Sequence, residues 1–65
     1  MNTKLVNAVL SYISERRQPL QQALQDGVAK DYAEYQKICG EIRGFTVVEQ
    51  YLLDLVKRLE REDDD

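Results

Sequence analysis

The side chains that carry out most enzyme chemistry are scarce in this chain. It contains one cysteine, Cys39, and no histidine. A cysteine nucleophile needs a base such as histidine beside it, and a structural zinc site needs several cysteine or histidine ligands. Paired carboxylates for acid–base work and a phosphate-binding loop are also missing. We therefore expect no enzyme activity, no cofactor and no metal site, and we interpret Cys39 as a half-buried, inert thiol.

The charged residues form two groups that bear on binding. Five basic residues are expected to gather at the open end of a hairpin: Arg16, Arg17, Lys57, Arg58 and Arg61. They are few, and no aromatic side chains accompany them as a stacking platform, which argues against nucleic-acid binding. The net charge of −3 comes from the last four residues, because residues 1–61 hold nine Lys/Arg and eight Asp/Glu. Residues 62–65 are predicted to be an acidic, disordered tail. Within it, Asp63, Asp64 and Asp65 are expected to attract a divalent cation only loosely, without the ordered geometry of a metal site.

The length of the chain limits its stability as a monomer. A chain of 65 residues buries only about 60% of its unfolded surface, and a single cysteine allows no internal disulfide. Association with another chain is then the expected source of stability. The N-terminal stretch MNTKLVNAVLSYI has no continuous apolar core, so we expect no secretory signal. No window of the sequence is apolar enough to cross a bilayer, so we expect no membrane role. The expected location is a reducing compartment.

Apolar residues recur at helical spacing in two segments. The first segment starts near Asn2 or Thr3 as a cap and ends at Asp26-Gly27, with Pro19 predicted to kink it. The second starts at Asp31, with Glu34 in the capping-box position. The stripes on the two segments are, respectively, Val6, Leu10, Ile13, Arg17, Leu20 and Leu24, and Tyr35, Ile38, Ile42, Phe45, Glu49, Leu52, Val56 and Leu59.

Residues 40–49 leave two interpretations of the second helix open. Gly40 and Gly44 weaken a helix interior, and Thr46 to Glu49 is another possible capping box; in this interpretation the chain breaks near Gly44 and forms three helices. The apolar stripe keeps its phase through this region, which favours one continuous helix. The predicted fold is thus all-α: an antiparallel helical hairpin over residues 1–61, assembling into a multi-chain helical bundle.

A hairpin that turns near residues 28–30 pairs residues whose numbers add to about 59. Arg17 would then lie opposite Ile42, and Glu49 opposite Leu10, roughly 10 Å apart along the axis. We therefore expect the two charges not to pair within one chain, and each to reach water or another subunit. The second helix is also expected to overhang the first, which leaves Val56 and Leu59 exposed.

A second apolar stripe on the second helix indicates a protein-binding surface. This stripe runs roughly opposite the first one and consists of Gly40, Gly44, Val47, Tyr51 and Leu55. Gly40 and Gly44 have the small-xxx-small spacing of close helix contacts. Alternatively, the two glycines make room for the kink that Pro19 is predicted to cause in the first helix, which explains them equally well. With Tyr12 as a further aromatic anchor, the predicted interface comprises Gly40, Gly44, Val47, Tyr51, Leu55, Val56, Leu59 and Tyr12.

The segment from Ala23 to Gly44 resembles small helical proteins encoded among the structural and packaging genes of tailed bacteriophages. The elements that carry the resemblance are Leu24, the glycine turn at Gly27, Tyr35 and the run Gly40-Glu-Ile-Arg-Gly44. The resemblance covers about a third of the chain. It implies a protein of the host cytoplasm or the virion that joins a particle or its assembly machinery, and it supplies no catalytic residues.

The function expected from the sequence is protein contact. The hairpin would be a small accessory structural or assembly protein of a tailed phage that binds copies of itself or a larger virion protein. The alternative is a phage-encoded inhibitor of a host enzyme, in which the acidic tail mimics nucleic acid. A dimerisation module with no other activity is a third possibility.

Overall fold

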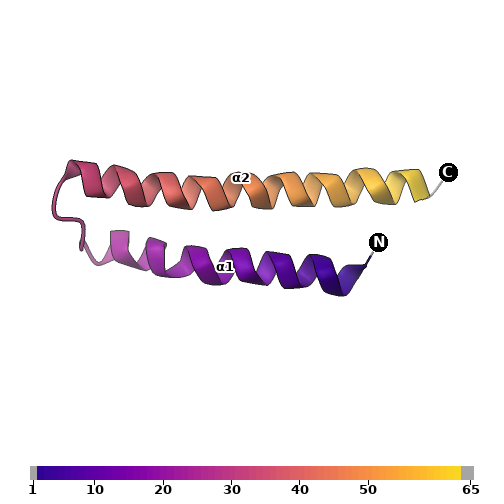
Figure 1. Cartoon of the computed structure of the whole chain (residues 1–65), viewed down its shortest axis with the longest axis horizontal. Coiled ribbons are helices and arrows are strands. Elements are labelled where there is room, and N and C mark those ends of the chain that lie inside the picture. The colour runs from indigo at the N-terminus through magenta and orange to yellow at the C-terminus, as the bar shows by residue number, and fades with distance from the viewer. Residues whose placement is uncertain (1, 64–65) are drawn as a thin grey trace.

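The chain forms two long helices that lie side by side and run in opposite directions (Figure 1). The computed structural model describes the backbone of residues 2–63 and the side chains of residues 2–61. Helix α1 spans Thr3–Gln25 and helix α2 spans Tyr32–Asp63, with no strand among the residues described. This confirms the predicted all-helical hairpin.

Helix α1 begins at a capped N-terminus and continues without interruption through its proline. The Asn2 side chain accepts a hydrogen bond of 3.1 Å from the backbone N–H of Leu5, so Asn2 rather than Thr3 is the cap. Pro19 lies inside the helix and provides no N–H for the carbonyl of Glu15. The apolar rhythm on both sides of Pro19 therefore belongs to one helix.

The end of α1 is a Schellman motif centred on Gly27. The N–H of Gly27 donates to the carbonyl of Leu24, and the N–H of Val28 donates to the carbonyl of Ala23, each at 3.1 Å. Gly27 has a φ of 68°, which a residue without a Cβ adopts readily. The helix stop predicted at Asp26-Gly27 is confirmed.

Helix α2 starts with the predicted capping box and is continuous. The N–H of Glu34 donates to the Asp31 carboxylate at 2.8 Å, while the Glu34 carboxylate accepts from the N–H of Lys30 at 3.0 Å. The helix passes through Gly40 and Gly44 without a break and continues to Asp63. The three-helix alternative is therefore wrong. Of the acidic tail, residues 62 and 63 have helical backbone, whereas their side chains and all of Asp64 and Asp65 lie outside the described residues.

The core between the two helices is thin. Among the side chains described, only Ile13 is fully buried, at 3% exposure. The remaining apolar contacts between α1 and α2 are half-buried, and they follow the two predicted stripes: Val6, Leu10, Leu20 and Leu24 on α1, and Ile38, Ile42, Phe45, Leu52 and Val56 on α2. We call these residues, with Ile13, the seam. A single layer of side chains is all that one helix pair can enclose.

The molecule is a rod. Its principal extents are 53 × 18 × 12 Å and its radius of gyration is 15.5 Å, whereas a compact domain of this length has a radius of gyration of about 11 Å. Among the residues described, neither helix is both long enough and apolar enough to cross a membrane. The shape leaves most side chains within reach of solvent or of another molecule.

Candidate interaction surface

A charged cluster at mid-length joins the two helices across the seam. The Arg17 guanidinium donates to both carboxylate oxygens of Glu49, at 3.0 and 3.1 Å, and to the Thr46 hydroxyl at 3.2 Å. The side chains of Arg17 and Glu49 are only 17% and 22% exposed. The bidentate geometry is the strongest arrangement available to an arginine and a carboxylate.

This pairing corrects the expectation that the two charges lie too far apart to meet. Side chains of a helix lean toward its own N-terminus. In an antiparallel pair the side chain of Arg17 therefore leans toward the open end of the hairpin, and that of Glu49 leans toward the loop. The two long side chains close the axial gap between their backbones. Neither charge requires a group from another subunit.

The ion pair shifts the titration of both partners. The hydrogen bonds from Arg17 lower the pKa of the Glu49 carboxyl below its ordinary value of 4.5, against a smaller opposing effect of desolvation. The same bonds raise the pKa of the Arg17 guanidinium. Both groups are therefore charged at neutral pH, and the cluster acts as a clasp between α1 and α2.

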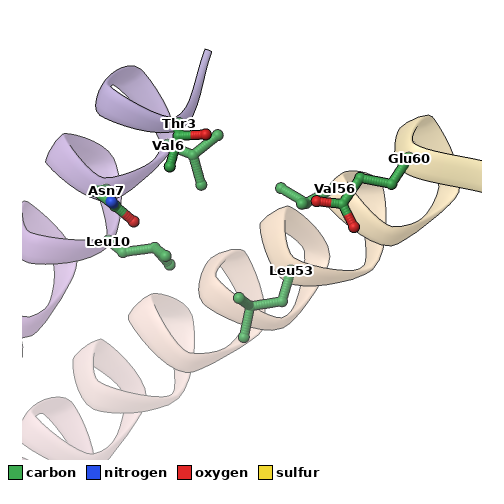
Figure 2. Close-up of a pocket in the computed structure, with 7 residues that line it drawn as sticks. All are labelled: Thr3, Val6, Asn7, Leu10, Leu53, Val56 and Glu60. Atoms are coloured by element: carbon green, nitrogen blue, oxygen red, sulfur yellow. The ribbon is translucent and has the colours of Figure 1, made fainter. Parts of the chain in front are cut away.

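A cleft of about 280 Å³ opens between the helices near the free ends of the hairpin (Figure 2). Its floor is apolar, from Val6 and Leu10 on α1 and Leu53 and Val56 on α2; its polar rim consists of Thr3, Asn7 and Glu60. These side chains lie on two facing helices with no convergent set of titratable groups. The cleft offers contact surface rather than chemistry.

The cleft also shows that the overhang of α2 is shorter than predicted. Val56 faces Val6 across the cleft and Glu60 lies on the rim with Thr3, so α2 has α1 opposite it as far as Glu60, and only its end extends past α1 (Figures 1 and 2). Val56 and Leu59 are half-buried instead of exposed. The cause is the same lean of side chains, which makes contacting residue numbers add to about 63 rather than 59.

The other predicted interface residues divide between two environments. Tyr12, Val47 and Tyr51 are exposed by about 60% each, and Leu55 is half-buried. A Cβ added at Gly40 or Gly44 would meet nothing within 4 Å, so neither glycine accommodates α1 or a kink at Pro19. Tyr35, expected on the seam, is exposed, and its ring stacks on that of Tyr32 with centroids 6.2 Å apart.

Sequence reasoning missed several exposed apolar residues on the two helices. Leu5 is 63% exposed, Val48 is 53% exposed, and Val9 also stands open to solvent. Leu5, Val9 and Tyr12 are spaced by four and three residues, which is the signal that a second stripe lies on α1 as well as on α2. It was overlooked because the longer stripe through Ile13 accounts for the helix without it.

Neither a search for metal-binding groups nor a comparison with known proteins assigns a function to the hairpin. Within residues 2–61, no group of three or more histidine, cysteine, aspartate or glutamate side chains is arranged to hold a metal ion. No protein-family model, curated protein or solved structure matches the chain.

Proposed function

We propose that this hairpin is a non-enzymatic protein-interaction module, and that it serves as a small accessory structural or assembly protein of a tailed phage. It would self-associate into a helical bundle or dock on a larger virion protein. The resemblance of residues 23–44 supports the phage assignment. The single observation that supports the interaction role is the thin core, in which Ile13 alone is fully buried among the side chains described.

The exposed apolar side chains give this role its physical basis. Leu5, Tyr12, Val48 and Tyr51 each expose more than half of their surface, although solvent contact with apolar side chains is unfavourable. Scattered exposed apolar residues are normal in soluble proteins. Here they recur at helical spacing along both helices, which is the pattern of a surface that another helix covers.

A bend in α1 at Pro19 belongs to this proposal. The missing N–H at Pro19 leaves the Glu15 carbonyl without its helical donor, which weakens the helix locally. A bend there would let the N-terminal part of α1 follow a partner. Replacing Pro19 with alanine is then expected to weaken association while it increases helicity, measured by sedimentation and by far-ultraviolet circular dichroism.

The experiment that tests the proposed function compares two samples. Mass spectrometry of purified particles determines whether the chain is a virion component, and native mass spectrometry of the isolated chain determines its assembly state. Presence in particles, or assembly of the isolated chain, is the expected result. A chain that is absent from particles, monomeric at high concentration and without effect on particle assembly when its gene is deleted would contradict the proposal.

The alternative, an inhibitor that uses Glu62 to Asp65 as a nucleic-acid mimic, depends on side chains outside the described residues. Deletion of residues 62–65 distinguishes the two roles. An inhibitor would lose its activity, whereas an interaction module would keep its mass and its place in the particle.

A further inference from the structure

The hairpin carries a second set of apolar residues beside the seam. On α1 it consists of Leu5, Val9 and Tyr12, about a quarter-turn from the seam. On α2 it consists of Val48, Leu55 and Leu59, which continue the three-and-four spacing of Phe45 and Leu52. We call these six residues, three from each helix, the apolar face.

Both halves of this set lie on one side of the hairpin. Viewed along each helix from its N-terminus to its C-terminus, the residues of the set are rotated counterclockwise from the seam about the helix axis. This holds for α1 and for α2. Because α1 and α2 are both right-handed and run in opposite directions, these two rotations bring the sets to the same side. By the same reasoning from helix positions, the cleft residues Asn7 and Leu53 lie on the opposite side of the seam.

The opposite side of the hairpin has a different composition. Away from the cleft floor, its helix positions carry mainly exposed polar and charged side chains: Ser14, Gln18 and Gln21 on α1, and Arg43, Gln50 and Lys57 on α2. The hairpin is therefore two-sided, with one side suited to water and one suited to burial. Such a pattern is typical of a helix pair that forms half of a bundle.

The apolar face covers only the half of the rod nearest the open end. Toward the loop the same side carries exposed charged residues, namely Arg16 on α1 and Lys37 and Glu41 on α2. A partner that covers the apolar face must therefore be apolar at the open-end half and tolerant of charge at the loop half. A second copy placed with its loop at the same end meets both requirements.

The accessible surface of the hairpin exceeds that of a compact monomer by an amount that one further hairpin can cover. The chain has an accessible surface of 5359 Å², whereas a compact monomer of 7.6 kDa has about 4,300 Å². The excess of about 1,100 Å² compares with about 800 Å² per partner in a standard interface. One further copy is thus large enough to cover the excess.

We propose that two copies of this chain pack apolar face against apolar face as a four-helix bundle with both loops at the same end. This deepens the proposed function, on which it rests, by naming the partner and the surface. In this arrangement α1 of each chain packs against α2 of the other, so every helix has antiparallel neighbours and the helix dipoles oppose one another. The reverse arrangement in full overlap would place Lys37 and Glu41 against Leu55 and Leu59 of the partner subunit.

The first test is the mass in solution. The wild-type chain is expected to sediment at about 15 kDa, twice its chain mass of 7.6 kDa. Leu5→Glu and Val48→Glu change exposed positions of the apolar face and are expected to halve this mass while the helical circular dichroism is retained. The matched controls Ser14→Glu and Gln50→Glu, on the other side, are expected to remain dimers.

The second test is the orientation of the two copies. In a Cys39→Ser background, a spin label at Val28→Cys reports the distance between the two loops, because Val28 is exposed in the loop. Loops at the same end predict a distance of the order of 20 Å, two helix spacings. A distance near or above the 53 Å length of the rod would overturn the arrangement.

The outcomes separate the dimer from the broader function. A wild-type chain that stays monomeric at millimolar concentration, assembles beyond a dimer, or keeps its dimeric mass in Leu5→Glu and Val48→Glu would overturn the proposed dimer. None of these results decides whether the chain is a component of a phage particle. The proposed function is judged by mass spectrometry of particles and by gene deletion, so the two proposals can fail independently.

Discussion

Arg17 and Glu49 are 32 positions apart in the chain, yet they face each other across the hairpin through two hydrogen bonds of 3.0 and 3.1 Å. This bidentate pair, with Thr46 beside it, is the one charged link between α1 and α2 among the residues described. The pair favours one register of the two helices, because a guanidinium donates to both oxygens of a carboxylate only in a narrow geometry.

The first prediction concerns the strength of this pair. Arg17→Met and Glu49→Gln each leave a partly shielded group without its partner, so each is expected to lower the urea midpoint of unfolding. The double variant is expected to be more stable than the sum of the two single effects, because it leaves no unpaired charge. Additive effects in this double-mutant cycle would show that the pair contributes nothing to holding the helices together.

The second prediction concerns pH. The pKa of the Glu49 carboxyl is lower in the folded chain than its ordinary value of 4.5. The stabilisation is therefore fully present above that ordinary value and is lost as the pH falls through the lower, folded value. Thermal melts from pH 7 to pH 2 should show a loss of stability that begins below the ordinary value. Glu49→Gln should reduce this dependence relative to the exposed control Glu41→Gln.

How much of this hairpin can be predicted from its sequence depends on the range of the interaction. Three of the four helix ends follow from local chemistry, because Asn2, Gly27 and Asp31 act within four residues of themselves. The continuity of α2 follows from the phase of its apolar stripe, which passes through Gly44 unchanged. These features need no knowledge of the partner helix.

The lateral contacts were harder to predict because they depend on where side chains point. Counting residues from the turn placed Arg17 opposite Ile42, and the lean of the side chains moved its contact to Glu49. The same omission led to the prediction that Val56 is exposed, whereas it is half-buried and lines the cleft. The stripe through Leu5 was missed because the first helix, unlike the second, was assigned only its longest apolar stripe.

The third prediction concerns the glycines within α2. A Cβ at Gly40 or Gly44 meets nothing within 4 Å, and alanine is favoured over glycine in a helix interior by about 1 kcal/mol. Gly40→Ala and Gly44→Ala are each expected to raise the free energy of unfolding by up to about this amount, with no change in sedimenting mass. A fall in mass would instead place a partner helix against these glycines.

The fourth prediction concerns the glycine of the loop. Gly27 has a φ of 68°, and a left-handed conformation is unfavourable for a residue with a Cβ by roughly 1–2 kcal/mol. Gly27→Ala is therefore expected to lower the free energy of unfolding by about 1 kcal/mol, and Gly27→Asn by less, since asparagine tolerates this region. Equal stability of the alanine variant and the wild type would contradict the Schellman motif.

The hairpin connection also orders the events of folding. Contacts next to the Gly27 turn close the shortest loops, and those between Val6 and Val56 close the longest, so we expect pairing to begin at the loop and to reach the open end last. The apolar face lies on that late-forming half. Arrival of a partner and completion of folding would then be a single step, and hydrogen exchange at the open end should slow sharply once the partner is bound.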